Sequence, residues 1–214
     1  MAVWNEAAGN GKGHGGIMVL VKEREGRAIQ LEKTDSNKQF IWLKIVENNT
    51  LLRIAACYFA PQVSKIYKKC GLDHNDPYAA LKKDVAIFSQ RGDVLLVGDF
   101  NARTANWQAS IFSYEVNDNP IWLTEERNHQ WERISEDAKG CNHFGEELIT
   151  LCGTFDLIIC NGLTRWAKSG NFTCNTYNGA SVVDYVICSQ NLYKNIEEVE
   201  IGEHIWDQII DRYT

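Results

Sequence analysis

The sequence predicts a layered α/β (α+β) fold with a large share of β-structure. Residues 16–60 are filled by short apolar or alternating runs separated by turn-forming residues, which is the pattern of consecutive strands. Two segments with apolar residues at helical spacing, 76–90 and 144–152, are followed by further strand-like runs. Because strands and helices come in mixed order, packed layers are expected instead of a purely parallel sheet.

The first four strands are predicted to form an antiparallel meander. They are short, and the residues between them are the turn-forming "EG", "TDSN" and "NN". Their predicted ranges are 16–23, 27–33, 39–47 and 51–60.

A helix is predicted next, over residues 76–90. Asp76 is its expected N-cap and Pro77 its first helical residue, a position at which proline is well tolerated. The apolar residues Leu81, Val85 and Phe88 fall on one face of this helix.

The rest of the chain is predicted to contain four strands and one helix. Residues 104–141 are polar, contain tryptophan and show no sustained period, so they are expected to be irregular. The predicted elements are strands at 93–98, 157–162, 171–177 and 181–188 and a helix at 144–152.

Composition indicates one globular domain over residues 1–214. The chain is 44% hydrophobic and 23% charged, and no apolar run approaches the roughly 20 residues of a membrane helix, so no membrane partner is expected. The cysteines number seven, and Cys57, Cys160 and Cys188 lie inside apolar runs, where a free thiol behaves as a small hydrophobe. Reduced thiols predict an intracellular protein, nuclear or cytoplasmic.

The stretch "LLVGDFNA" (95–102) ends an apolar strand in a carboxylate. Asp99 and Asn101 are two residues apart, and on extended backbone such side chains point the same way, so they are expected to converge. A carboxylate can take a proton from water or hold a hard cation, and an amide can orient a phosphoryl oxygen. The alternative is a turn, in which Asp99 caps the next segment and Asn101 is left-handed.

Two further strands end in or contain polar side chains. The run "RIAACYFAP" delivers Tyr58 to a loop, and "SVVDYVIC" places Asp184 among valines and an isoleucine. A buried, unpaired charge is costly, so Asp184 is expected to have a cationic or hydrogen-bonding partner, for which histidine is the usual choice in a hydrolase.

These residues together resemble the endonuclease/exonuclease/phosphatase superfamily, and most of all the endonuclease domain of LINE-type (non-LTR) retrotransposons. "CYFAP" resembles the family's Tyr-x-x-Pro loop, "VGDFNA" its Gly-Asp-x-Asn signature and "SVVDYVICS" its Ser-x-x-Asp-Tyr strand. "GNFTC" resembles the threonine-bearing strand that comes before. The stretch from 131 to 162 is similar to retroelement members through Arg133, Ser135, Asp137, Asn142, Gly145 and Leu148.

The resemblance implies two packed mixed β-sheets flanked by helices, a four-layer DNase-I-like sandwich, and cleavage of phosphoester bonds with Mg²⁺ or Mn²⁺. By motif match, Asp99 would activate water, Asn101 would bind phosphate, Tyr58 would contribute a hydroxyl, and Asp184 would orient a catalytic histidine. Asp99 and Asn101 would also form a weak, partial metal site. DNA is the implied substrate, although the formal charge of −6 gives no bulk attraction for it.

Two parts of the family pattern are expected to be missing. The family's metal-holding glutamate and an active-site asparagine precede the Gly-Gly strand, and Asn5 and Glu6 lie too close to Gly15 to replace them. The Ser-Asp-His triplet that supplies the histidine is replaced by "DQI" at 207–209, with His204 a few residues early. The domain is therefore expected to be incomplete at both ends, with an N-terminal truncation.

Three functions follow as hypotheses. The first is a divalent-metal-dependent endonuclease, degenerate or weakly active; the others are a non-catalytic retroelement remnant and a phosphatase of a small phosphoester. On an endonuclease, three lysines after the Tyr58 loop could contact phosphates, and two tryptophans could stack on bases; a solvated surface and simple packing are the alternatives. These residues are Lys65, Lys68, Lys69, Trp107 and Trp166.

Overall fold

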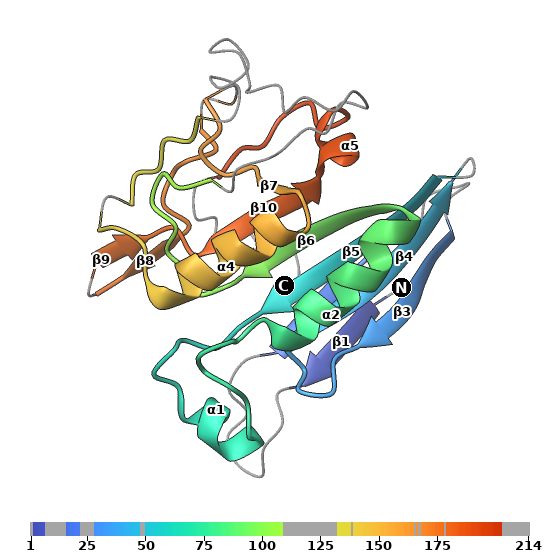
Figure 1. Ribbon diagram of the computed structural model, residues 1–214, viewed down its shortest axis with the longest axis horizontal. Coiled ribbons are helices and arrows are strands. Elements are labelled where there is room, and N and C mark those ends of the chain that lie inside the picture. The colour runs from blue at the N-terminus through green and yellow to red at the C-terminus, as the bar shows by residue number, and fades with distance from the viewer. Residues whose placement is uncertain are drawn as a thin grey trace, which may run out of the picture.

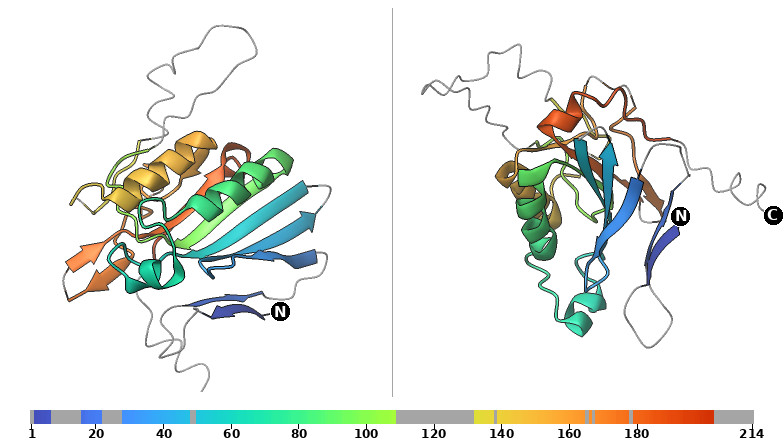
Figure 2. Two further views of the ribbon diagram at one scale, coloured as in Figure 1. Left: turned by 60° about the horizontal axis from the view of Figure 1, so that its bottom comes forward. Right: turned by 90° about the vertical axis from the view of Figure 1, so that its right-hand side faces the viewer.

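The computed structural model contains a six-stranded mixed sheet with helices on one face and a two-stranded sheet on the other (Figure 1). The two views in Figure 2 show these three layers from the side. The two facing sheets and the helices on the large one confirm the predicted DNase-I-like fold class, and three of the four expected layers lie among the described residues. The structure describes residues 2–6, 16–21, 28–47, 50–108, 132–137, 139–164, 166, 168–177 and 179–202.

The six-stranded sheet has the order β3-β4-β5-β6-β10-β7. Only β5 and β6 run parallel, and the other neighbours are antiparallel. All six strands were predicted, with small differences at their ends. Their bounds are β3 Ala28–Thr34, β4 Phe40–Glu47, β5 Thr50–Tyr58, β6 Asp93–Asp99, β7 Leu157–Ile159 and β10 Asp184–Ser189.

The first predicted strand does not join the meander. It is β2 (Gly16–Leu20), and it pairs with β1 (Ala2–Glu6), a strand that the sequence did not predict. Ile17 of β2 packs on Ile41 and Leu43 of β4 on the face of the large sheet away from the helices. The meander therefore contains only β3, β4 and β5. Strand β2 belongs to a second layer, which packs its apolar side chains on the face of the large sheet.

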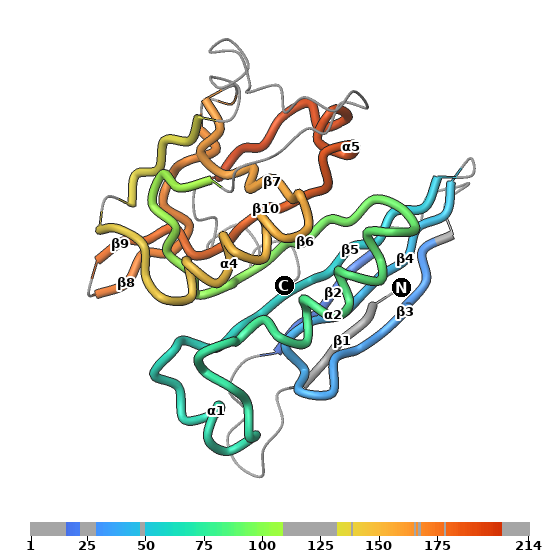
Figure 3. The backbone as a smooth tube through the Cα atoms, in the orientation of Figure 1, coloured from blue at the N-terminus to red at the C-terminus, as the bar shows by residue number. Residues whose placement is uncertain are grey.

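Two helices cover the other face of the large sheet. The chain leaves β5, forms α1 (Lys65–Cys70) and α2 (Ala79–Phe88), and returns as β6, as the trace in Figure 3 shows. The second covering helix, α4 (His143–Thr154), begins at Asn142, whose side chain accepts a hydrogen bond from the Gly145 N–H. The remaining short elements are η1 Ser89–Arg91, α5 Gln190–Tyr193, β8 Cys174–Thr176 and β9 Gly179–Ser181.

The predicted N-cap of the helix at 76–90 is wrong. The helix begins at Ala79, and Asp76 instead accepts a hydrogen bond from Lys82 at 2.8 Å. None of the helices in the described part of the chain has both the length and the apolar character needed to cross a bilayer.

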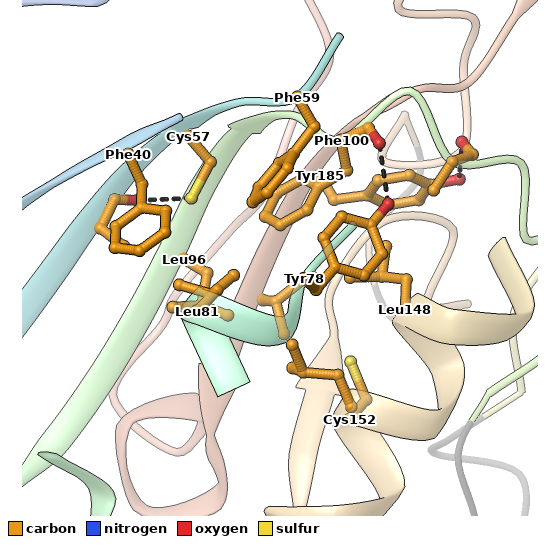
Figure 4. Packing of buried hydrophobic residues seen from close by; sticks show 14 of the residues in the cluster. Phe40, Cys57, Phe59, Tyr78, Leu81, Leu96, Phe100, Leu148, Cys152 and Tyr185 are labelled. Atoms are coloured by element: carbon orange, nitrogen blue, oxygen red, sulfur yellow. Dashed lines mark hydrogen bonds between the residues drawn. The ribbon is translucent and has the colours of Figure 1, made fainter. Parts of the chain in front are cut away.

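Aromatic side chains anchor the ends of β5 and β6 from the helix side of the sheet. Phe59 and Phe100, the residues after those strands, are fully buried, and their ring centroids lie 5.7 Å apart (Figure 4). Tyr78 packs edge-on against Phe59 at 4.7 Å, and its hydroxyl donates to the Phe100 carbonyl at 2.8 Å. Burying each such side chain contributes about 1.5–3 kcal/mol. The ends of β5 and β6 are therefore fixed by aromatic packing on the helix side of the sheet.

The cysteines lie in the structure as free thiols. Cys57, Cys160 and Cys188 are buried in the sheet, as their apolar surroundings predicted, and burial raises the pKa of Cys57 far above its ordinary value. Within the described residues these side chains serve as small hydrophobic groups.

Candidate active site

Three of the predicted site residues form one row across the large sheet. Asp99 ends β6, and its register partners are Tyr58 on β5 and Asp184 on β10. Side chains at matched positions of neighbouring strands share one face of the sheet, and directly opposite Cβ atoms are about 4.5–5.5 Å apart. The row lies on the face away from α2 and α4, since Phe59 and Phe100 point into the core below. All three residues are half-buried.

The row lies at the sheet end from which α1 and the β8–β9 hairpin extend (Figure 1). The carboxyl ends of the parallel strands β5 and β6 meet there, and β10 begins there. Residues that are more than 120 positions apart in sequence, Tyr58 and Asp184, are thus brought to one edge of the sheet.

Asp99 has the most perturbed acidity in this row. Its pKa is raised from 3.8 to about 6, mainly by burial and in smaller part by the facing carboxylate of Asp184, while hydrogen bonds from Asn101 partly oppose the shift. The main opposing bond comes from the Asn101 N–H to Oδ1 at 2.8 Å. A carboxyl with a pKa near neutrality can both lose and regain a proton at physiological pH, which is what general base catalysis requires.

Asn101 does reach Asp99, but not in the way that the extended backbone predicted. Its φ of 48° is left-handed, and its N–H closes a turn on the Asp99 carboxylate. The local conformation is therefore that of the alternative interpretation, a turn. The Asn101 side chain donates through Nδ2 to the Phe59 carbonyl at 2.6 Å, so one of its two N–H donors is used inside the protein.

Gly98 allows β5 and β6 to approach each other just before Asp99. Its φ is 131°, and a Cβ at this position would collide with the carbonyl oxygen of Cys57. A side chain here would push Asp99 away from Tyr58, which is a physical reason for a glycine before the aspartate.

Asp184 is held through its backbone. Thr173 Oγ1 accepts from the N–H of Val183 at 3.0 Å and of Asp184 at 3.1 Å. Asn161, itself buried, donates through Nδ2 to the Asp184 carbonyl at 3.1 Å and accepts from the Val186 N–H at 2.8 Å. Asn161 and Thr173 were not predicted as site residues; their signal was their place in the polar motifs that precede β10.

Asp184 is less buried than expected, because its side chain is half-buried. No described residue offers its carboxylate a hydrogen-bond donor or a cation, and His204 lies outside the described residues, so the pairing with a histidine stays a prediction. The strand is covered fully only on the helix side, where Tyr185 and Ile187 point. The Asp184 charge therefore lies on the site face, opposite Asp99.

Tyr58 contributes a phenol at the other end of the row. Burial raises the pKa of its hydroxyl, and the charge of Asp99 raises it further, so the group stays protonated at neutral pH. Its ring packs with Ile17 of β2 in the cluster on this face. The backbone N–H of Tyr58 donates to the Gln39 carbonyl at 2.8 Å, which fixes the strand end.

A complete metal centre is not formed by the described residues. They contain no group of three histidine, cysteine or acidic side chains that could hold a metal ion. The backbones of Asn5 and Glu6 pair with Ile17 and Gly16, but their side chains lie outside the described residues, as do His204 and the stretch 207–209.

The predicted DNA-contacting residues divide into two groups. Lys65, Lys68 and Lys69 are exposed on α1, and Trp107 exposes 60% of its surface in the loop after the site. Trp166 is buried against Tyr193, with centroids 5.6 Å apart, and its Nε1–H donates to the Glu197 carbonyl. Trp166 is therefore a packing residue and is not available for stacking on bases.

Comparison with known proteins places the chain in a family. The family model described as "Endonuclease-reverse transcriptase" matches residues 52–207. Among solved structures, the chain is similar to the endonuclease domain of TRAS1, a telomere-specific non-LTR retrotransposon, with a TM-score of 0.51 and 13% identity over 90% of this chain and 69% of that one. It is also similar to the 3′ phosphatase NExo from Neisseria bound to a product DNA hairpin, with a TM-score of 0.48 and 14% identity over 91% and 68%.

At this identity, the likeness to TRAS1 shows the fold alone. No curated protein matches the chain. The family match covers the residues that form the row and the loops that hold it, from β5 to the segment beyond α5. The chain therefore belongs to the endonuclease/exonuclease/phosphatase superfamily, in the family described as endonuclease-reverse transcriptase.

Proposed function

We propose that this chain is a divalent-metal-dependent phosphodiester hydrolase, an endonuclease domain of the retrotransposon type. Its activity is proposed to be weak, because Asp99 and Asn101 form only a partial metal site. The observation that carries the proposal is the row of Tyr58, Asp99 and Asp184 at one edge of the sheet. Such a row gathers a base, a hydroxyl donor and a second negative charge around one small volume.

Asp99 is proposed as the group that takes a proton from the attacking water. Its pKa near 6 leaves it mostly ionised at neutral pH while keeping it basic enough to accept a proton. The Tyr58 hydroxyl, protonated at this pH, is proposed to donate to a phosphoryl oxygen. Asn101 is proposed to donate to the same phosphate through the second N–H of its amide, since the Phe59 carbonyl takes only one of the two.

Asp184 is proposed to complete the site as the residue that orients a histidine. Its backbone is fixed by Thr173 and Asn161, and its carboxylate faces Asp99. A carboxylate that holds the ring nitrogen of a histidine sets the tautomer and the orientation of that ring.

The donors in the row suit a hard divalent cation, Mg²⁺ or Mn²⁺. Two carboxylates face each other with no cation between them among the described residues, and the Asn101 amide adds a further oxygen. Asp99 and Asn101 would hold the cation, with water completing its shell. A bound cation would supply charge stabilisation to the phosphoryl oxygens and would lower the repulsion between Asp99 and Asp184.

DNA is the proposed substrate. The exposed lysines of α1 follow the Tyr58 loop, where a phosphate backbone that approaches the row would pass, and Trp107 is exposed in the loop that follows Asn101. The net charge of −6 repels DNA, and the positive charges of these lysines and the stacking surface of Trp107 would offset that repulsion locally.

A plasmid-nicking assay tests the proposal. Supercoiled DNA is incubated with the chain and Mg²⁺, with and without a chelator, and the conversion to open circles is followed. Nicking that needs the cation and is lost in Asp99→Ala supports the endonuclease. Glu32→Gln, a change on β3 away from the row, is the control and is expected to nick like the wild type. No nicking by the wild type supports the non-catalytic remnant, and release of phosphate from a small phosphoester without nicking supports the phosphatase.

A further inference from the structure

The segment from Arg133 to Gly145 resembles retroelement endonucleases, but the proposed function gives its residues no role. Asp137 is its most constrained member, with a side chain only 2% exposed. Its carboxylate accepts from four donors, which come from three parts of the chain. These donors are Arg103 Nε, Arg103 Nη2, the Lys139 N–H and the Val182 N–H.

One side of Asp137 holds the loop that carries Asp99. Arg103, four residues after Asp99, binds the carboxylate with two of its nitrogens, and the Nε–Oδ2 distance is 2.8 Å. A two-point arginine–carboxylate pair fixes orientation as well as distance. Asn142 ties the same loop to α4, because its side chain accepts from the Arg103 N–H at 2.9 Å and donates to the Asn101 carbonyl at 3.4 Å.

The other side of Asp137 holds the start of the strand that carries Asp184. Oδ2 accepts from the Val182 N–H at 3.2 Å, two residues before Asp184. One buried carboxylate thus contacts both chain segments whose aspartates face each other in the row. Tyr185 makes a neutral bridge between the same two segments, because its hydroxyl contacts Thr104 Oγ1 at 3.1 Å and donates to the Val182 carbonyl at 3.0 Å.

From this geometry we infer that Asp137 is a positioning residue, which fixes the relative placement of Asp99 and Asp184 by joining their two segments through Arg103 and Val182. Only the expected effect of Asp137 on catalysis rests on the proposed function; its effect on the placement of the two segments does not. Asp137 itself does not belong to the row, and its oxygens are occupied by internal donors.

The electrostatics agree with a fixed tie. Burial alone would raise the pKa of Asp137, but the Arg103 guanidinium and the N–H groups of Val182 and Lys139 hold it below its ordinary value. The pair is therefore charged at neutral pH, and removing one partner leaves the other charge poorly compensated. Loss of either partner is expected to loosen both segments together.

Amide hydrogen exchange tests the tie without any need for activity. In Arg103→Gln, the Val182 N–H should exchange at least about tenfold faster, although it does not touch Arg103. In Asp137→Asn, the backbone N–H groups of Asn101 and Arg103 should also exchange faster, although these two N–H groups donate to Asp99 and Asn142 and not to Asp137. Glu32→Gln is the matched control, because it also removes a carboxylate from an arginine pair, with Arg53, at a distance from the row.

Each outcome decides the inference. The inference would be overturned if Arg103→Gln folds and its Val182 N–H exchanges as slowly as in Glu32→Gln. It would also be overturned if both Arg103→Gln and Asp137→Asn fail to fold, because the pair would then support the whole fold and not the site in particular. If only Asp137→Asn fails to fold, Arg103→Gln decides. Where the wild type nicks DNA, the variants should lose at least about tenfold in kcat with KM within about twofold. A wild type that does not nick contradicts the proposed function alone, since the exchange result stands independently.

Discussion

Asp99 and Asp184 face each other at matched positions of the antiparallel strands β6 and β10. Like charges at directly opposite positions destabilise a sheet, so this pair does not contribute to the stability of the fold. Here the two residues are supported by Gly98, Asn161 and Thr173, which hold the strand ends in place. The repulsion between the two carboxylates has consequences that can be measured.

The first prediction concerns the dependence of stability on pH. The pKa of Asp99 is about 6 in the folded chain against 3.8 in the unfolded one, so the folded form holds this proton more tightly. Between about pH 4 and pH 6, the Asp99 contribution to stability is therefore lost as pH rises. The variant Asp99→Asn stays neutral, so its Tm should match that of the wild type near pH 4 and exceed it above pH 6. Thermal unfolding followed by circular dichroism checks this, and a Tm difference that does not change with pH would contradict it.

The second prediction concerns divalent cations. A cation held by Asp99 and Asn101 relieves the repulsion between Asp99 and the facing Asp184, and it stabilises only the folded form. At about ten times its Kd, such a cation adds about 1.4 kcal/mol, or roughly 3–6 °C in Tm for a chain of this size. Millimolar Mg²⁺ should raise the Tm of the wild type at pH 7.5 and leave that of Asp99→Asn unchanged. An equal rise in both proteins would show that the cation binds elsewhere.

The third prediction concerns Gly98. The variant Gly98→Ala places a Cβ against the Cys57 carbonyl at a positive φ, so it should lower the free energy of unfolding by at least about 2 kcal/mol. The control is Gly71→Ala, which has a positive φ but nothing within 4 Å of the new Cβ, and which should cost only about 1 kcal/mol. Urea unfolding measures both values. Equal losses would mean that backbone strain, and not the close approach of β5 and β6, requires the glycine.

The fourth prediction concerns the Tyr185 hydroxyl. It accepts from the Thr104 N–H and donates toward the carbonyls of Ala102 and Val182, so Tyr185→Phe leaves buried polar groups without a partner. The loss in unfolding free energy should be about 1–3 kcal/mol. The fully exposed Tyr177 offers the control, since Tyr177→Phe should change nothing. A neutral Tyr185→Phe would show that these groups find other partners.

Much of the fold could be predicted from the sequence because its strands are strongly patterned. The residues of β4, β5, β6 and β10 form apolar or alternating runs bounded by turn residues, and α4 has a clear apolar face with a good N-cap at Asn142. The strand β1 was missed because "AVWNE" is short and followed by a glycine-rich stretch. Pairing of β2 with β1 instead of β3 depends on long-range packing of Ile17, which no local pattern contains.

The sequence could predict that these residues come together but not their conformation. The four residues were singled out by their places at or in apolar strands and by the motif resemblance, and three of them lie in one row. The left-handed turn at Asn101 was only an alternative, because local sequence does not decide between extended and turn backbone after a strand. The half-buried state of Asp184 could not be predicted, since it depends on which face of the sheet is covered. The supporting contacts of Asn161, Thr173 and Asp137 depend on tertiary structure alone.

The rates of DNA nicking by single and double variants of the row test the central claim most directly. If the row acts as one hydrolytic unit, Tyr58→Phe, Asp99→Asn and Asp184→Asn should each lower the Mg²⁺-dependent rate by at least about tenfold, and Asp99→Asn/Asp184→Asn should lose little more than the worse single variant. Wild-type rates in all three single variants, or losses that multiply in the double variant, would contradict the claim that these side chains act together.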